Sequence, residues 1–344
     1  MRRYWARTGW GFLIAAISAS VLFVDMPSGH AQRPLRPPRP GRALQRPLPP
    51  SGSPDTWMVG PDEEFKKPSE VARRVRSGDT VKIAPGTYED CTTWPRTVDG
   101  LVIEGTDVII EGPVCAGKAL FVIAADNVTI RGITFRNAKD RAHNGAGIRQ
   151  EGLNLTIENS RFIDNEDGIL GIQRPRSTMI IRDSLFQGNG TCTAACAHGI
   201  YVNKLALLHI EHSQFLGQHE GHHVKSRALR TELVDNIISD GPDGNSSYLI
   251  DIPNGGDVVI TGNKLEKGAH ATNRTAAIIM GEEAVGRPER QNPATEVRIE
   301  DNSFVNQMTA RTIFVRNKTE TPAVLRGNKI EGPTDPLDGP GSNN

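Results

Sequence analysis

The chain repeats one short pattern of apolar and polar residues eight times. Each copy alternates apolar and polar positions and then breaks at Asn, Asp, Ser or Gly. The copies end at Phe135, Phe162, Phe186, Phe215, Ile238, Leu265, Phe304 and Ile330. Successive ends lie 23 to 29 residues apart, except for one step of 39. Alternation predicts strands, and the residues at the breaks predict turns.

Units of this kind cannot bury their apolar face alone, so they must stack on one another. Short strands at this period, with no helical segment between them, predict an all-β solenoid: a parallel β-helix of about ten coils. Propellers and leucine-rich repeats fit the period and the residue pattern less well. A polar residue precedes most copy ends, which predicts a stacked polar ladder at one turn. These residues are Ser160, Ser184, Ser213, Asn236, Asn263, Asn302 and Asn328.

The predicted β-helix domain spans residues 57–332. Residues 65–84 contain a short amphipathic stretch followed by a strand pattern, which predicts an N-terminal cap over the first coil. Such a cap is needed because a bare coil exposes an apolar end and a free strand edge. Residues 333–344 are rich in Pro, Gly, Asp and Asn, so we expect a disordered tail.

The first 56 residues differ from the rest of the chain. Three arginines precede an apolar run at residues 12–24, and small residues follow as far as Ala31. This pattern predicts a signal peptide, residues 1–31, and the run is short for a membrane span. Residues 32–56 are rich in Pro and Arg and predict an extended spacer. We therefore expect a periplasmic or secreted protein with no membrane span after cleavage.

The cysteines fit an exported protein. The chain has four, and their spacing suggests the pairs Cys91–Cys115 and Cys192–Cys196. Zinc ligation is the competing interpretation, but no pair has CxxC spacing.

Overall charge and composition exclude other classes. Forty basic and forty acidic residues balance, so no basic excess indicates nucleic-acid binding. Aromatic residues make up only 5% while glycines number 35, which argues against a helical bundle. We expect a monomer without a cofactor. Calcium is conceivable, but no motif supports it.

Several segments carry a resemblance to a known group of proteins. Residues 59–61 and 78–88, together with the repeats, resemble right-handed parallel β-helix proteins of the pectin-lyase-like superfamily. Residues 221–228 and 247–256 resemble a branch of secreted bacterial members. The resemblance covers residues 57–332 and implies a single-stranded right-handed parallel β-helix. It does not select an activity, because the superfamily includes lyases, hydrolases, epimerases and inactive members.

A second strand pattern recurs between the copy ends, and its outward positions change character at mid-helix. Stacking the coils predicts one polar patch there. Its members are Tyr201, Asn203, Lys225, Arg227 and Asp251. The edge of the patch is formed by His198, His222 and His223, and Arg149 lies on the same face. We interpret Arg149, His198, Asn203, His222 and Asp251 as substrate-binding residues.

This patch suits proton abstraction at a uronate, which is the step shared by polysaccharide lyases and C5-epimerases. Such a reaction needs a cation on the carboxylate and a base near the α-proton. Arg227 is our candidate cation and Lys225 our candidate base, its pKa lowered by neighbouring cations. Tyr201 or His223 would supply a proton. The alternative is structural: an ion pair between Lys225 and Asp251, with the remaining groups solvated.

The Lys225-Ser226 pair also resembles the strand that carries the catalytic Lys in alginate and chondroitin β-helix lyases. Those lyases place an Arg on the next coil, and this chain has Pro253 or Asn254 there instead. Only Lys225 carries over from that resemblance. An acidic polysaccharide is the predicted partner, and non-catalytic binding at the same groove remains a second hypothesis.

Hydrolysis is the third hypothesis, with Asp164, Glu166 and Asp167 as candidate carboxylates, although no clean pair appears on one face. Residues 219–223 match HExxH literally. That motif binds zinc on a helix, whereas here it lies between a turn and a strand, so we predict no metal site. The 39-residue step inserts a polar loop, residues 281–293, which either walls a groove or is a tolerated surface loop.

Overall fold

The computed structural model describes residues 52–344. The expected signal peptide and nearly all of the expected spacer fall in residues 1–51, outside the described residues. Within 52–344 the regular structure is almost entirely strand. The exceptions are one short α-helix, α1 (Pro68–Val71), and one 3₁₀ turn, η1 (Pro288–Arg290).

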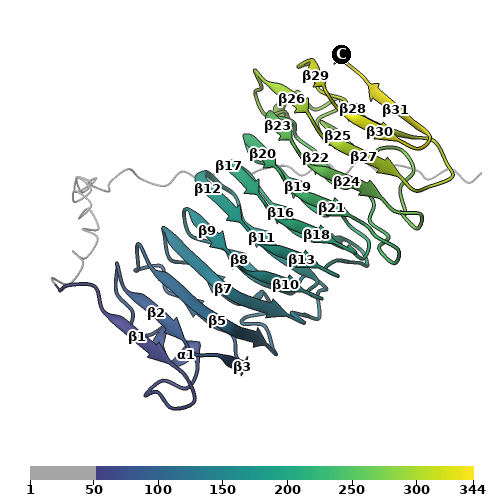
Figure 1. The fold of residues 1–344 in the computed structure, drawn as a ribbon. Helices are drawn as coiled ribbons and strands as arrows, with labels where there is room; N and C mark the ends of the chain where they lie inside the picture. The colour runs from purple at the N-terminus through teal and green to yellow at the C-terminus, as the bar shows by residue number, and fades with distance from the viewer. Residues whose placement is uncertain (1–51) are drawn as a thin grey trace, which may run out of the picture. The chain divides into compact units, whose positions relative to one another are not determined.

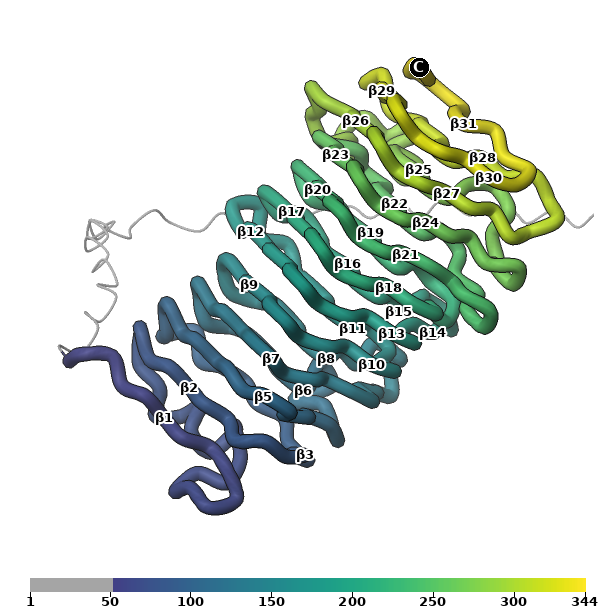
Figure 2. Tube along the Cα trace, in the orientation of Figure 1, coloured from purple at the N-terminus to yellow at the C-terminus, as the bar shows by residue number. Residues whose placement is uncertain are grey.

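The described chain winds into a parallel β-helix whose coils stack from the N-terminal to the C-terminal end (Figures 1 and 2). Each complete coil visits three faces in the same order, and strands on a face pair in parallel with those of the coils before and after. The long strands β5 (Val102–Glu111) and β7 (Val128–Arg136) run through both the first and the second face. This architecture confirms the predicted all-β solenoid, and the third face alone contains ten strands.

The strands are assigned to faces by their pairing. The first face contains β1 (Thr56–Val59), β2 (Thr80–Ile83), β9 (Leu155–Glu158), β12 (Arg174–Arg182), β17 (Leu205–Glu211), β20 (Arg230–Val234), β23 (Asp257–Thr261), β26 (Val297–Glu300), β29 (Ala323–Arg326) and β32 (Gly341–Asn343), with the first halves of β5 and β7. The second face contains β3 (Gly86–Glu89), β10 (Arg161–Ile163), β13 (Leu185–Gln187), β18 (Gln214–Leu216), β21 (Ile237–Ser239), β24 (Lys264–Lys267), β27 (Ser303–Asn306) and β30 (Lys329–Glu331), with the second halves of β5 and β7. The third face contains β4 (Thr92–Trp94), β6 (Ala119–Ile123), β8 (Ala146–Gln150), β11 (Asp167–Gly171), β16 (Ile200–Val202), β19 (Val224–Ser226), β22 (Ile250–Ile252), β25 (Ile278–Met280), β28 (Thr312–Asn317) and β31 (Thr334–Asp338). A small antiparallel hairpin, β14 (Thr191–Cys192) and β15 (Cys196–Ala197), projects between the second and third faces.

The eight apolar copy ends found in the sequence pair with one another in an unbroken column along the second face. Four of them form a stack of phenylalanine rings inside the solenoid. The ring centroids of Phe162, Phe186 and Phe215 are 4.6 and 4.5 Å apart along this stack. All three side chains are buried. The column therefore fixes the register of the coils and supplies much of the core.

The turn between the first and second faces is built the same way in coil after coil. Its first residue has a positive φ, between 47° and 69°, at Asn159, Asp183, His212, Asp235, Gly262, Asp301 and Gly327. Gly, Asn, Asp and His tolerate this conformation best, which explains their recurrence. The next residue belongs to the predicted polar ladder, which is buried from Ser160 to Asn302 and half-buried at Asn328. In its asparagine part, the Asn263 backbone N–H donates to Asn302 Oδ1 over 2.9 Å, and Asn302 donates to Asn328 Oδ1 over 3.1 Å.

The two ends of the solenoid differ in how they are closed. At the N-terminal end, α1 begins with Pro68 and buries Val71 against the core, as expected for a cap. At the C-terminal end, the expectation of a disordered tail is wrong. Strand β31 pairs with β28 and strand β32 pairs with β29. The last coil would otherwise present a row of unpaired backbone groups, and an edge strand tolerates proline because one side needs no partner.

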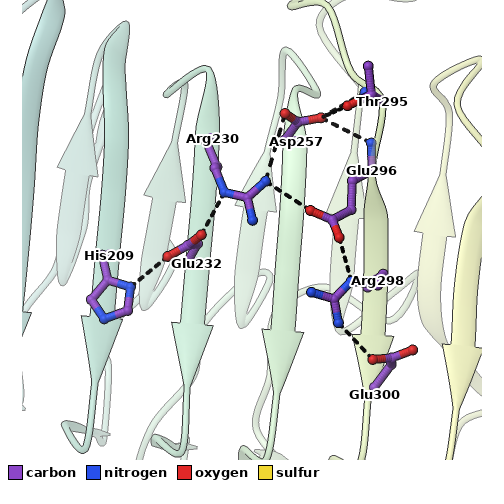
Figure 3. Close-up of polar contacts among 8 residues, drawn as sticks. All are labelled: His209, Arg230, Glu232, Asp257, Thr295, Glu296, Arg298 and Glu300. Atoms are coloured by element: carbon purple, nitrogen blue, oxygen red, sulfur yellow. Dashed lines mark hydrogen bonds and ion pairs between the residues drawn. The ribbon is translucent and has the colours of Figure 1, made fainter.

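Opposite charges alternate along the outer surface of the first face. We call this row the ionic ladder. Its members, in order along the solenoid, are Lys82, Glu104, Arg131, Glu158, Arg182, Glu211, His209, Glu232, Arg230, Glu296, Arg298 and Glu300. Figure 3 shows its last part, where Asp257 also lies within 3.8 Å of Arg230. Each charge meets an opposite one on its own or a neighbouring coil, so the row is close to neutral.

Both predicted disulfides are present, Cys91–Cys115 and Cys192–Cys196. Two disulfides fit a protein that matures in an oxidising compartment. No helix in residues 52–344 is long and apolar enough to cross a membrane.

Candidate functional site

The candidate site lies on the outer surface of the third face, at mid-helix. Pairing places Tyr201, Lys225 and Asp251 directly above one another on β16, β19 and β22. Leu170 and Ile279 occupy the same column on either side of them. The predicted patch is therefore assembled as the strand alternation required, between apolar neighbours.

Lys225 is held between carboxylates. Its Nζ lies 2.9 Å from Asp251 Oδ2 and 3.5 Å from Glu283 Oε1. The Lys225 side chain is 14% exposed and that of Asp251 only 6%. Burial raises the pKa of Asp251, while the ammonium of Lys225 opposes that shift. The nearest charged partners of Lys225 are thus two carboxylates, whereas the sequence had suggested cationic neighbours.

Arg227 makes the densest set of contacts in the site. Its Nη1 and Nη2 each donate to one oxygen of Glu283 over 2.8 Å, a bidentate fork. Its Nε donates to Tyr201 Oη over 3.1 Å, and Nη1 also donates to Asn254 Oδ1 over 2.7 Å. Burial disfavours its charge, but the hydrogen bonds to Glu283 and Tyr201 outweigh this and raise the pKa of Arg227. The hydrogen bonds from Arg227 hold the pKa of Glu283 below its usual value.

Tyr201 forms the floor beneath the two cations. Its ring centroid lies 5.8 Å from Lys225 Nζ and 5.7 Å from the Arg227 guanidinium carbon. Its hydroxyl accepts from Arg227 and lies 3.3 Å from Asn203 Oδ1, to which it can donate. Asn203 in turn donates to the Gly171 carbonyl over 3.1 Å. The phenol proton is thus directed by neighbours on both sides.

Two neutral histidines border the site. His198 and His222 stack with ring centroids 4.8 Å apart. The Nδ1 of His198 accepts the His222 backbone N–H, and the Nδ1 of His222 accepts the Tyr248 backbone N–H. Each ring therefore carries its proton on Nε2, and His222 Nε2 lies 3.4 Å from Asp251 Oδ2. Burial, with help from Lys225, lowers the pKa of His222 to about 3, and burial lowers the pKa of His198 well below its usual value.

His223 does not join the site. Its Nε2 lies 2.9 Å from Asp240 Oδ1, and both side chains are buried inside the solenoid. The regular alternation begins only at Val224, so the residue before it follows the bend of the turn and not the pleat. This placement corrects the prediction that His223 faces a substrate.

Arg149 also lies apart from the other predicted residues. Leu170 separates it from Tyr201 in the column, and its Nε lies 3.4 Å from Glu151 Oε1. Lys118 contacts the same carboxylate at 2.6 Å. Arg149 therefore belongs to a separate ion-pair group three coils from Lys225.

Two of the three carboxylates considered for hydrolysis, Glu166 and Asp167, bind backbone N–H groups, whereas Asp164 is exposed. Glu166 Oε2 accepts the N–H groups of Gly145 and Asp140, and Asp167 Oδ1 accepts the His198 N–H over 2.7 Å. Burial raises the pKa of Asp167 to about 8. A buried, backbone-bonded pair of this kind supports the chain path, so of these three carboxylates only Asp164 is open to solvent. Within residues 52–344, no three His, Cys, Asp or Glu side chains gather to hold a metal ion.

Glu283, Asn254 and Tyr248 are site residues that the sequence did not single out. Glu283 comes from the inserted loop, three residues after β25 ends, and its backbone N–H donates to the Pro253 carbonyl. The 39-residue step had located the loop, but nothing in the pattern indicated which of its side chains would reach the patch. The loop does form one wall of the site, which was one of its two expected roles.

Comparisons with known proteins agree with the architecture. A family model described as a right handed beta helix region matches residues 86–238. No curated protein sequence matches the chain.

Three solved structures illustrate the structural similarity. The pectin methylesterase of Aspergillus niger superposes with a TM-score of 0.46 and 11% identity, over 85% of this chain and 92% of that one. The A-module of a mannuronan C-5 epimerase from Azotobacter vinelandii gives 0.45 and 15%, over 78% and 91%. An alginate lyase from a Paenibacillus species gives 0.41 and 14%, over 82% and 99%. The parallel coils and the family match together identify residues 86–238 as a right-handed β-helix region, which the coils on either side continue.

Proposed function

We propose that this protein binds an acidic polysaccharide on its third face and transfers a proton at a uronate unit, as a lyase or a C5-epimerase. The observation that carries the proposal is the fork between Arg227 and a carboxylate, that of Glu283, with Lys225 Nζ 3.5 Å from the same group. Two cations that converge on one carboxylate are what a uronate needs. The Glu283 carboxylate stands in for the sugar carboxylate.

In the proposed reaction the ionised hydroxyl of Tyr201 acts as the base and removes the proton on the carbon next to the carboxylate. The electron pair moves into the carboxylate and forms an enolate-like intermediate, whose charge Arg227 and Lys225 stabilise. The intermediate then either expels the oxygen across the neighbouring bond, which takes the proton from Tyr201 and leaves a double bond, or takes a proton on the opposite face from a water molecule, which recovers one from Tyr201. The former is elimination and the latter is epimerisation. No cofactor is required.

Tyr201 is the proposed proton-transfer group. Its hydroxyl lies against the Arg227 Nε at 3.1 Å, so it stands next to the carboxylate position. Lys225 is assigned to charge stabilisation, because its two partners are carboxylates. His222 and Asp251 keep Lys225 in place, and the neutral imidazoles of His198 and His222 offer hydrogen bonds to sugar hydroxyls.

A second candidate function, binding without turnover, is favoured by one observation. Lys225 and Arg227 are matched by Asp251 and Glu283, so the four side chains are neutral as a group. A groove of this kind could hold a polysaccharide for assembly or attachment. Export by the predicted signal peptide, residues 1–31, would bring the protein to its polymer under either function.

The test is ultraviolet absorbance of the purified protein with pectate, alginate, hyaluronate and chondroitin. Elimination creates a conjugated double bond, so absorbance should rise with one of them. Tyr201→Phe keeps the ring beneath the cations but removes the hydroxyl, and it should abolish the rise. If absorbance stays flat, incorporation of solvent deuterium into the polymer tests epimerisation. No rise and no deuterium uptake would leave only the binding function.

A further inference from the structure

The position beside Arg227 that the proposed function assigns to a sugar carboxylate is occupied by the carboxylate of Glu283. Glu283 satisfies both terminal nitrogens of Arg227 at 2.8 Å, and it shares Lys225 with Asp251. The remaining Arg227 contacts are to Tyr201 and Asn254. A sugar carboxylate could form the same fork only after Glu283 has left it.

The backbone that carries Glu283 is fixed at both ends of the loop. The N–H of Gly281 donates to the Ile252 carbonyl over 2.9 Å, and that of Glu283 donates to the Pro253 carbonyl over 3.0 Å. At the other end, the buried side chain of Asn292 donates to the carbonyls of Arg227 and Ala228 over 3.2 and 3.1 Å. These hydrogen bonds hold the backbone of the 281–293 loop in place, so a ligand would have to displace the Glu283 side chain and not the whole loop.

The Glu283 side chain, by contrast, can leave. It is 35% exposed, whereas Asp251 on the other side of Lys225 is 6% exposed. Rotation about its side-chain bonds would carry the carboxylate into water without moving the backbone.

We propose that Glu283 is a built-in competitor that a substrate carboxylate must displace, and that it thereby makes the site selective for ionised uronates. This inference rests on the proposed function. The exchange replaces one carboxylate by another on Arg227 and Lys225, so an ionised uronate leaves no cation unpaired. A neutral sugar or a uronate methyl ester offers no charge to replace Glu283. Displacement would then leave the mostly buried Arg227 without a carboxylate, while Lys225 would keep only Asp251.

The competitor also lowers the affinity for the correct ligand. Part of the binding free energy is used to break the Glu283 fork, as for any ligand that binds only the minor, open state. Weakening the fork should therefore tighten binding. Glu283→Gln retains the shape of the side chain and one hydrogen-bond acceptor but removes the charge. Glu289→Gln makes the same change at an exposed residue of the same loop and is the matched control.

The experiment is titration calorimetry of the purified proteins with hexamers of galacturonate, mannuronate and glucuronate-containing hyaluronate, and with methyl-esterified galacturonate hexamers. We expect Glu283→Gln to bind the preferred acidic hexamer about tenfold tighter than wild type. The ratio of its affinities for the acidic hexamer and for the methyl-esterified hexamer should be smaller than in wild type. Glu289→Gln should bind both hexamers as wild type does. Thermal unfolding of each variant confirms that it is folded, and Glu283→Ala provides a second variant without the amide.

The outcomes separate this inference from the proposed function. Equal or weaker binding by both Glu283 variants, while wild type turns over a polymer, overturns the competitor and leaves the enzyme standing. Tighter binding by the variants with no turnover of any polymer supports the competitor and removes the lyase or epimerase. No binding of any hexamer by wild type or by either Glu283 variant overturns both.

Discussion

The ionic ladder on the first face and the candidate site on the third face are built from the same kinds of charged residue, yet they differ in burial and in the origin of their partners. In the ladder, partners come from strands at matching register, and Arg131 is 47% exposed. In the site, Lys225 is 14% exposed, and Glu283 arrives from an inserted loop. Only the site adds a tyrosine and two neutral histidines.

The difference shows what burial does to a charge. Exposed pairs on neighbouring strands are solvated and screened, so each contributes little on its own. The charges of the site are partly desolvated, so losing one partner leaves an ion that cannot be rehydrated fully. The ladder therefore tolerates substitution, whereas the site depends on each of its members.

The largest expected effect is on catalysis. Arg227→Ala removes the fork that would hold the sugar carboxylate, and kcat/KM for the active polymer should fall about 10²- to 10³-fold. Arg131→Ala, in the ladder, removes a more exposed arginine outside the site and should leave turnover unchanged. Rates come from the absorbance or deuterium assay. If kcat/KM fell equally in both variants, the third face would not differ in function from the first face.

The next largest effect is on how the free energy of unfolding depends on pH, and it comes from Asp167, beside the site. The folded state raises the pKa of Asp167 to about 8, while an unfolded aspartate titrates near 3.9. Between those values the folded protein keeps a proton that the unfolded chain has lost. The contribution of Asp167 is therefore fully present below about pH 4 and decreases by about 1 kcal/mol per pH unit up to about 8.

Asp167→Asn should remove that slope, because an amide does not titrate. Its oxygen can still accept the His198 N–H, so the local structure should be retained. The free energy of unfolding in denaturant, measured from pH 5 to pH 8, gives the slope directly. Asp164→Asn changes an exposed aspartate three residues earlier and is the control. An unchanged slope in Asp167→Asn would show that another group carries the pH dependence.

A smaller effect is expected from the ion pair beneath the site. Asp251→Asn leaves the Lys225 ammonium with Glu283 alone, and it should lower the free energy of unfolding by about 2 kcal/mol. Adding Lys225→Met to the same chain should restore most of that loss, since no unpaired ion remains. Glu158→Gln in the ladder is the matched change at a carboxylate that is 24% exposed, compared with 6% for Asp251. If it destabilised the protein as much as Asp251→Asn, burial would not be what separates the two regions.

The smallest effect belongs to the ladder. Arg131→Ala should cost less than about 1 kcal/mol of unfolding free energy, and added salt should reduce the cost further. Arg131→Glu places three acids in a row with Glu104 and Glu158, so it should cost more. Combining it with Glu158→Arg should recover stability. Denaturant unfolding at low and high salt measures these differences, and a salt-independent loss would point to packing of the arginine stem instead.

The sequence analysis was accurate for residues in the strands. Residues 162, 186 and 215 were aligned by their repeat alone, and the structure pairs them in that order. Tyr201, Lys225 and Asp251 were predicted to stack, and they do. The period of two decides which side of a strand faces the core, and a one-residue slip would expose every apolar side chain. Register is therefore encoded locally and can be read from the chain.

The wrong predictions concern a turn, the margin of the polar patch and the C-terminal end of the solenoid. His223 was predicted to lie at the edge of the patch, but it lies in the turn before β19 and is buried. Arg149 was grouped with the patch although Leu170 stands between them. The tail was expected to be disordered because its composition is polar, but the open edge of the last coil offers it backbone partners. In each case a neighbour far away in sequence decided the outcome.

The sequence by itself determined the solenoid, its coil register and the column that holds Tyr201, Lys225 and Asp251, because strand periodicity requires one face to be buried. Only the tertiary structure decided that Glu283 completes the site. A loop has no period that could place its side chains. The position of Glu283 depends on where the backbone after β25 meets the Pro253 carbonyl, and on the charge of Arg227 one coil further away.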